Sequence, residues 1–190
     1  MQPFNIYLSG VGGQGIGLLC EILLRAADYA GYTAKAVDTH GLAQRGGTVV
    51  SHIRLGAEVP TPLISERQAD LVIGLERHEA LRSVQSMLHD SGTLVYYDTV
   101  LQPLGVRLGV EAETSTADLE RACGLRGITV HRVEPTELAD PRMQNIVLLA
   151  RIDRLQLVPG VATEHIQQAM DDLLTGSMLA ANKTLFQSAR

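Results

Sequence analysis

The length, composition and charge of the chain set limits on the class of protein. Its 190 residues are 45% hydrophobic and 19% charged, which excludes intrinsic disorder and permits a single domain over residues 1–190. The formal net charge of −5 leaves no basic excess to neutralise nucleic-acid phosphates, and no apolar run is long enough to span a bilayer.

The cysteine content limits the redox chemistry that the chain can carry alone. Only Cys20 and Cys123 occur, and they lie far apart in the sequence. An iron–sulfur cluster requires about four thiolates at recognisable spacing, so this chain cannot hold one by itself. No metal-ligand spacing is visible elsewhere. Two cysteines and no leader-like segment favour a cytoplasmic protein.

The start of the chain predicts a strand, a glycine turn and a helix. The apolar run Phe4–Ser9 is interrupted by Gly10–Gly15. From Ile16 to Ala30 the apolar residues recur at helical spacing, and Gly31 is placed to end the helix.

The rest of the chain alternates predicted strands and helices. Strands are expected at 33–38, 48–55, 69–75, 93–98 and 128–133, with one extra strand between 99 and 113. Helices are expected at 77–88, at 117–123, from Pro141 (capped by Asp140) to 155, from Thr163 as cap to 174, and at 176–189. This order predicts a Rossmann-like α/β fold, a mostly parallel sheet with helices on both faces and C-terminal helices.

The glycine turn fits the pattern G-x-G-x-x-G, through Gly10, Gly12, Gly13, Gln14 and Gly15. Glycines allow close backbone approach to a phosphate, and a helix N-terminus offers free N–H groups. No Ser, Thr, Asp or Asn is placed to cap the following helix. The pattern therefore predicts an anion or nucleotide-like ligand, although a tight strand-to-helix turn alone would also explain the glycines.

A second polar segment bears on which ligand is bound. Asp38 stands where a dinucleotide fold places an acidic residue for the ribose. It is followed by His40–Gly47 (HGLAQRGG), a donor-rich segment where such a fold would continue into a helix. The alternative reading of this segment is a solvated loop in which Gly46 and Gly47 only turn the chain.

The two segments together resemble a known family. GVGGQGI at 10–16 and HGLAQRGGTVVSHIR at 40–54 resemble the gamma-type subunit of 2-oxoacid:ferredoxin oxidoreductases. The Gln44-Arg45-Gly46-Gly47 form is most similar to the indolepyruvate branch. The similarity continues through ADLVIGLE at 69–76 and the helix that contains Asn145, and so covers most of the chain.

The resemblance implies a function and a division of labour. Such enzymes decarboxylate a 2-oxoacid on thiamine diphosphate, pass electrons through iron–sulfur clusters to ferredoxin, and deliver the acyl group to coenzyme A. Thiamine diphosphate, magnesium and the clusters are expected on partner subunits, and the isolated chain is expected to be inactive. The implied cofactor-binding residues, for part of coenzyme A, are Gly10, Gly12, Gly13, Gln14, Gly15, Gly46 and Gly47. The implied catalytic contacts are His40, Gln44 and Arg45.

Other interpretations stay open at this point. His52 and Arg54 alternate along a predicted strand, so both could face one cleft or simply an exposed surface. A free-standing NAD(P)-dependent oxidoreductase using Asp38 and a non-catalytic scaffold subunit are the alternative functions. The 2-oxoacid and the state of the isolated chain, monomer or homodimer, are not fixed by these patterns.

Overall fold

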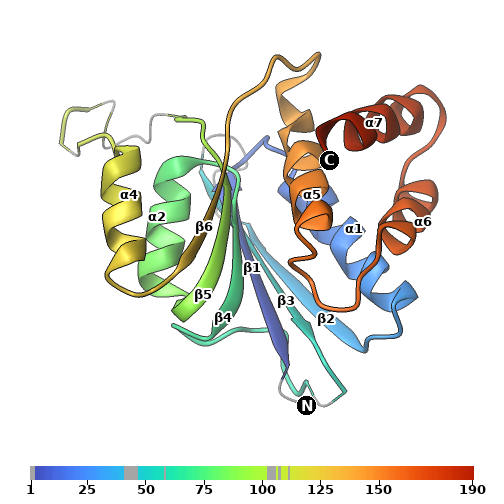
Figure 1. Ribbon diagram of the computed structural model, residues 1–190, viewed down its shortest axis with the longest axis horizontal. Coiled ribbons are helices and arrows are strands. Elements are labelled where there is room, and N and C mark those ends of the chain that lie inside the picture. The colour runs from blue at the N-terminus through green and yellow to red at the C-terminus, as the bar shows by residue number, and fades with distance from the viewer. Residues whose placement is uncertain (1–2, 41–46, 58, 102–105, 107, 111) are drawn as a thin grey trace.

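The described part of the chain folds around a six-stranded sheet with helices on both faces (Figure 1). The computed structural model describes residues 3–40, 47–57, 59–101, 106, 108–110 and 112–190. The strands are β1 (Phe4–Val11), β2 (Ala34–His40), β3 (Thr48–Leu55), β4 (Ala69–Gly74), β5 (Leu88–Tyr97) and β6 (Thr129–Val133). Their order across the sheet is β2-β3-β1-β4-β5-β6.

The sheet is mostly parallel, as predicted. β1, β4, β5 and β6 pair in parallel, whereas β3 runs antiparallel to both of its neighbours, β1 and β2. Since β3 reverses the direction twice, all the other strands run the same way. Its insertion separates β2 from β1, which would be adjacent in a dinucleotide-binding fold.

The helices form a layer on each face of the sheet (Figure 1). They are α1 (Ile16–Tyr29), α2 (Arg77–Ser86), α4 (Thr116–Gly124), the 3-10 turn η1 (Pro141–Met143), α5 (Gln144–Arg154), α6 (Thr163–Leu173) and α7 (Gly176–Ala189). α1 and α5 cover one face, with α6 packed on α1 and α7 on α5, while α2 and α4 cover the other face. Within the described ranges, no helix has both the length and the apolarity needed to cross a membrane.

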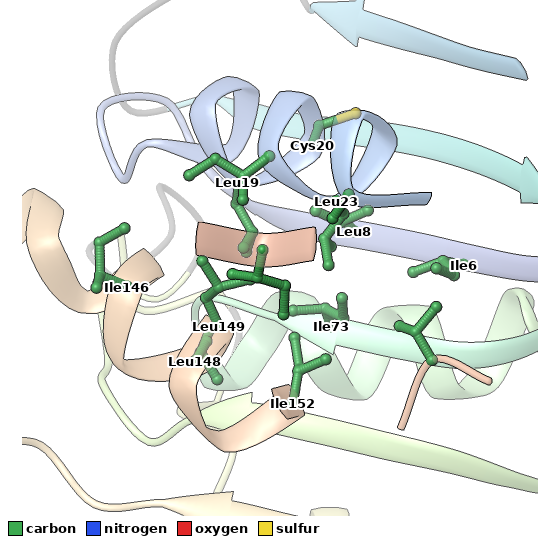
Figure 2. Packing of buried hydrophobic residues seen from close by; sticks show 14 of the residues in the cluster. Ile6, Leu8, Leu19, Cys20, Leu23, Ile73, Ile146, Leu148, Leu149 and Ile152 are labelled. Atoms are coloured by element: carbon green, nitrogen blue, oxygen red, sulfur yellow. The ribbon is translucent and has the colours of Figure 1, made fainter. Parts of the chain in front are cut away.

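The larger core lies between the sheet and the α1–α5 layer (Figure 2). α5 is buried along most of its length, because its sequence is apolar nearly all round. It lies over β5 and β6, beside α1, and beneath α7. The labelled core residues are Ile6, Leu8, Leu19, Cys20, Leu23, Ile73, Ile146, Leu148, Leu149 and Ile152.

Two helix boundaries form as the sequence predicts. Gly31 (φ 84°) follows α1 in the left-handed region. The Gly31 N–H donates to the Asp28 carbonyl, and the Tyr32 N–H reaches back to the Ala27 carbonyl, a Schellman ending. At the other boundary, the Asp140 carboxylate accepts a hydrogen bond from the Arg142 N–H and caps η1.

Two boundary predictions were wrong. α6 is capped at Ala162 rather than Thr163, because the Thr163 hydroxyl donates instead to the buried Asp153 carboxylate, at 3.0 Å. β5 begins at Leu88, earlier than expected, since Leu88 pairs with Ala69 before the register shifts. The extra strand predicted between 99 and 113 falls partly on residues 102–105, 107 and 111, which lie outside the described residues; the described residues there form no strand.

Candidate functional site

The candidate site lies where β1 and β4, two adjacent parallel strands, end at the centre of the sheet. The chain leaves β1 towards α1 on one face and leaves β4 towards α2 on the other. Open α/β sheets bind ligands at such a divergence, beyond the carboxyl ends of the strands. The predicted glycine segment lies at this point.

The glycine loop, Gly12–Gly15, is held from within by the Gln14 side chain. Gln14 Oε1 accepts a hydrogen bond from the Val11 N–H at 2.7 Å, and Nε2 donates to the Leu75 carbonyl at 2.9 Å. The residue is only 5% exposed. Both ends of its amide are therefore used by the backbone, and the predicted contact of this residue with a cofactor stays a prediction.

Glycine is required at different positions of the motif for different structural reasons. A Cβ on Gly10 would lie 2.7 Å from Gln14 Oε1, and one on Gly15 would lie 2.5 Å from Asn145 Nδ2. Asn145 Nδ2 also donates to the Gly15 carbonyl, so Gly10 and Gly15 make room for two buried amides. Gly13 (φ 105°) is exposed, and no described atom lies within 4 Å of where its Cβ would stand. It supplies the turn and the open surface.

The start of α1 presents hydrogen-bond donors that no other described residue uses, as predicted. Its N-cap is Gly15, which has no side chain to offer. Among the hydrogen bonds of the described residues, none uses the backbone N–H of Ile16, Gly17 or Leu18, and the series begins with the Leu19 N–H on the Gly15 carbonyl. No acidic residue lies in the first turn of α1. These donors and the positive end of the helix dipole favour an anion here.

The donors open onto two concavities that meet at Gly15. The first, of ≈ 350 Å³, is lined by Val11, Gly12, Gly13, Gly15, Ile16, Gly17 and Val49. The second, a groove of ≈ 570 Å³, is lined by Gly15, Leu18, Asp140, Arg142, Met143, Asn145, Ser177, Met178, Ala181 and Asn182. Together they offer a small backbone-lined pocket continued by a longer, largely apolar groove.

The second sequence motif meets the first. The Gly12 N–H donates to the Gly47 carbonyl at 2.9 Å, so the two motifs are adjacent in space. His40 ends β2 opposite Val49, and its side chain lies outside the described part of the chain. Gln44, Arg45 and Gly46 also lie outside it, and their predicted contacts remain predictions.

The position of Asp38 argues against a ribose-binding role. Because β3 lies between β2 and β1, Asp38 is two strand spacings, about 9–10 Å, from the strand that leads into the glycine loop. In a dinucleotide fold the two strands are neighbours. The geometry therefore disfavours the alternative of a free-standing NAD(P)-dependent enzyme.

His52 and Arg54 share one face of β3 but lie away from the glycine loop. His52 is buried, and its Nδ1 accepts from the Ile64 N–H at 3.1 Å. Arg54 donates to Asn5 Oδ1 at 2.9 Å. Asn5 lies near the start of β1, whereas the glycine loop follows the end of β1, so Arg54 and the loop lie at opposite ends of this strand. Burial lowers the pKa of His52, which suits a neutral structural imidazole.

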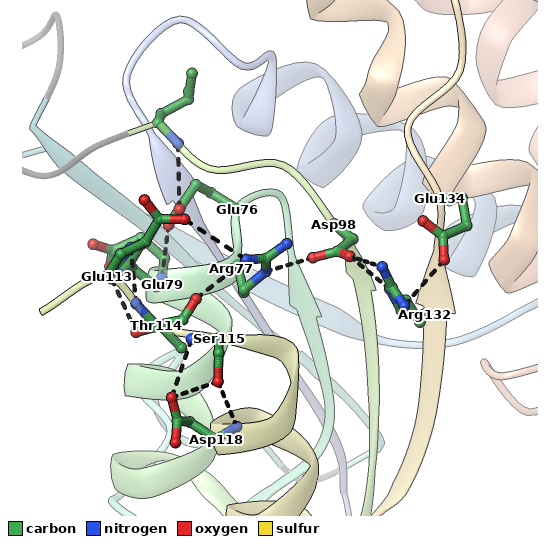
Figure 3. A network of polar contacts seen from close by, with 12 residues as sticks. Glu76, Arg77, Glu79, Asp98, Glu113, Thr114, Ser115, Asp118, Arg132 and Glu134 are labelled. Atoms are coloured by element: carbon green, nitrogen blue, oxygen red, sulfur yellow. Dashed lines mark hydrogen bonds and ion pairs between the residues drawn. The ribbon is translucent and has the colours of Figure 1, made fainter.

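A charge cluster around the buried Asp98 carboxylate, at the ends of β4 and β5, was not predicted (Figure 3). Asp98 follows β5, and its carboxylate accepts from Arg77 Nε and from Arg132 Nε, each at 2.6 Å. Arg77 also donates to the Thr114 carbonyl at 3.2 Å. The available signal was a charged residue within two positions of the end of a buried strand, which occurs at Asp98 after β5 and at Glu76 after β4.

Two further buried carboxylates lie at the start of α2. Glu76 is fully buried and caps the helix, since its Oε2 accepts from the Glu79 N–H at 2.9 Å. Glu79 Oε1 accepts from the Thr48 hydroxyl at 3.1 Å and from Arg82 Nη1 at 3.2 Å. Burial raises the pKa of Glu79, and the nearby Arg82 and Thr48 only partly offset this effect. Ionised Glu79 is therefore disfavoured by folding.

This shift predicts how stability depends on pH. Since folding raises the pKa of Glu79, the native chain loses stability as pH rises from its ordinary value of 4.5 through the folded value. Glu79→Gln does not titrate, so the Tm of the variant minus that of the native chain should increase between pH 4.5 and about pH 8. Thermal unfolding measures this difference.

The matched control is Glu66→Gln, because Glu66 is exposed and the same charge is removed. Its Tm difference should stay nearly constant over that pH range. Equal pH profiles for the two variants would show that burial does not penalise the Glu79 carboxylate.

Relatives resemble the chain along almost its whole length. The family described as pyruvate ferredoxin/flavodoxin oxidoreductase matches residues 5–190. The indolepyruvate oxidoreductase subunit IorB of Archaeoglobus fulgidus is 34% identical over 186 residues, 94% of this chain and 89% of the relative. The IorB subunit of Methanothermobacter thermautotrophicus is 30% identical over 190 residues, 97% and 94% of the two chains. These matches confirm the resemblance carried by the two motifs.

Solved structures share the fold. Pyruvate oxidoreductase subunit PORC from Thermotoga maritima has a TM-score of 0.69 at 19% identity, covering 100% of this chain and 96% of that one. A 2-oxoglutarate:ferredoxin oxidoreductase from Magnetococcus marinus, with 2-oxoglutarate, coenzyme A and succinyl-CoA bound, has a TM-score of 0.69 at 16% identity. Our chain covers 30% of the Magnetococcus chain. The predicted fold class is thereby confirmed.

Proposed function

We propose, since this chain belongs to the pyruvate ferredoxin/flavodoxin oxidoreductase family, that it is the gamma-type subunit of a 2-oxoacid:ferredoxin oxidoreductase. Its complex would oxidatively decarboxylate a 2-oxoacid and form the acyl-CoA. The names of the relatives favour an aryl 2-oxoacid of the indolepyruvate type. A cytoplasmic location is proposed with it, because both cysteines are buried free thiols.

We propose that the chain contributes the site for the phosphates of coenzyme A. The observation that carries this proposal is that no other described residue uses the N–H groups of Ile16, Gly17 and Leu18. Ile16 and Gly17 line the pocket beside Gly13, and Leu18 lines the adjoining groove. Backbone donors at a helix N-terminus fit a phosphate or pyrophosphate. The adjoining groove is largely apolar, with Met143 among its lining residues. It therefore suits the long arm of coenzyme A, which consists of amides and methylenes. Coenzyme A, when bound, supplies the thiol that accepts the acyl group.

Thiamine diphosphate, magnesium and the iron–sulfur clusters are assigned to partner subunits, with ferredoxin as the acceptor of the complex. A cluster binds thiolates, and burial raises the pKa of Cys20 to about 12 and that of Cys123 to about 11. The described residues also hold no group of three or more His, Cys, Asp or Glu side chains that could bind a metal. The chain therefore suits a role in binding one substrate, coenzyme A, with the redox centres on partner subunits.

Gly17 provides the test of the coenzyme A site. It lines the pocket, and a Cβ added there would meet no described atom within 4 Å. Because Ala favours a helix over Gly by about 0.5–1 kcal/mol, Gly17→Ala should leave Tm unchanged or raise it. The methyl group would nevertheless obstruct phosphate approach, and the KM for coenzyme A of the assembled complex should rise roughly tenfold, about 1.4 kcal/mol. The KM for the 2-oxoacid should not change.

The matched control is Gly124→Ala, at the end of α4, where a Cβ also meets no described atom. It should leave both KM values as they are in the native complex. An unchanged KM for coenzyme A in folded, assembled Gly17→Ala would reject the proposed site.

We also propose that Arg45 contacts an anionic group of substrate or cofactor. Its planar fork suits a carboxylate or a phosphate. Losing a charged hydrogen bond costs roughly 1.5–3 kcal/mol, so Arg45→Ala should lower kcat/KM by roughly one order of magnitude or more. Arg45→Lys should recover only part of the loss, because the charge remains but the two-pronged geometry does not. Steady-state kinetics of the complex, with assembly checked by gel filtration, measures this; native kinetics for Arg45→Ala would exclude the contact.

A further inference from the structure

We propose that Gln14 is a positioning residue of the anion site, which holds the glycine loop in its binding shape without contacting the ligand. The inference rests on the proposed coenzyme A site and goes beyond it, because it gives this residue a role other than ligand contact. Two observations support it. Both ends of the buried Gln14 amide are hydrogen-bonded to the backbone, and a second amide, that of Gln144, donates to the same carbonyl as Gln14 does.

The Gln14 amide joins two chain segments that diverge from the sheet. Its Oε1 accepts from the Val11 N–H, the last residue of β1, while its Nε2 donates to the Leu75 carbonyl, directly after β4. The donor of one bond and the acceptor of the other are both backbone groups. A side chain that is only an acceptor or only a donor could satisfy one of them but not both.

The anchor at Leu75 is fixed by the sheet itself. The Leu75 N–H donates to the Ser9 carbonyl of β1 at 2.8 Å, continuing the parallel pairing of β1 with β4. Gly10, between Ser9 and the loop, leaves the space that Gln14 Oε1 occupies. The Gln14 side chain thus links the glycine loop to the β1–β4 junction of the sheet, directly before the start of α1.

A second amide reaches the same carbonyl without contacting the loop. Gln144 Nε2, from the first turn of α5, donates to the Leu75 carbonyl at 3.4 Å, and Gln144 is also 5% exposed. Gln144 lines neither the pocket nor the groove at the candidate site. It therefore provides a control: a buried glutamine of similar exposure with the same acceptor, but with no hold on the glycine loop.

Replacing Gln14 by methionine keeps the length of the side chain and removes both hydrogen bonds. The Val11 N–H then loses its partner, and the loop is no longer tied to Leu75. When a loop samples several conformations, its apparent affinity for the ligand is the intrinsic affinity multiplied by the fraction of time that it spends in the binding conformation. Since the chemistry takes place elsewhere, the loss should appear in the affinity for coenzyme A and not in turnover.

The experiment compares Gln14→Met with Gln144→Met in the complex assembled with the partner subunit. We expect the KM for coenzyme A to rise roughly tenfold in Gln14→Met, with kcat at saturating coenzyme A and the KM for the 2-oxoacid close to native values. Gln144→Met should leave the KM for coenzyme A nearly unchanged. Hydrogen–deuterium exchange of the peptide that covers residues 9–15 should be faster in Gln14→Met than in Gln144→Met.

Each other outcome has a definite meaning. Equal increases of KM in both variants, or no increase in either while Gly17→Ala does raise it, would overturn the inference. Unchanged exchange at residues 9–15 in Gln14→Met would overturn it as well, whatever the kinetics. If Gly17→Ala has no effect on the KM for coenzyme A, the coenzyme A site itself fails, and the exchange rates alone then judge whether Gln14 holds the loop.

Discussion

The hydrogen bond from the Gln14 amide to the Leu75 carbonyl joins the β1–α1 connection to the β4–α2 connection, and these two connections diverge at the centre of the sheet. β1 continues into α1 on one face, and β4 continues into α2 on the other. The bond fixes where the first turn of α1 begins relative to the sheet edge. Asn145, from α5, adds a second tie at the Gly15 carbonyl, so the helix layer and the loop are fixed together. The open N–H donors depend on this arrangement.

The neighbouring edge of the sheet carries buried charge instead of open donors. Asp98 is shared by Arg77 and Arg132, and Glu79 is buried against Thr48 and Arg82. Buried charges are costly unless they are paired, and here each carboxylate has partners from separate elements. The cluster ties α2 and β6 to the end of β5. It lies beside the glycine loop, at the same ends of the strands.

Local patterns predicted the features that depend on nearby residues. The glycine loop before an amphipathic helix, the end of α1 at Gly31 and the cap at Asp140 each follow from residues within a few positions. Strand β3 was predicted from its β-branched residues, but neither its direction nor its place between β2 and β1 could be, because strand pairing is set by distant contacts. That placement is what displaces Asp38 from the site.

The candidate site was predicted in location more than in detail. Motif and context identified the glycine loop, whereas its contact with the second motif, from the Gly12 N–H to the Gly47 carbonyl, is seen only in the fold. They could not show that Gln14 turns inward, because the acceptor at Leu75 is 61 residues away along the chain. The cluster around Asp98 was missed for the same reason: its members are ordinary charges in sequence, and only the sheet brings them together.

The central claim is that the start of α1 binds a phosphate group of coenzyme A. A density map of the assembled enzyme with coenzyme A bound tests it most directly. We expect phosphate density within hydrogen-bond distance of the backbone N–H groups of Ile16, Gly17 and Leu18. Coenzyme A bound elsewhere, with this pocket holding only solvent, would contradict it.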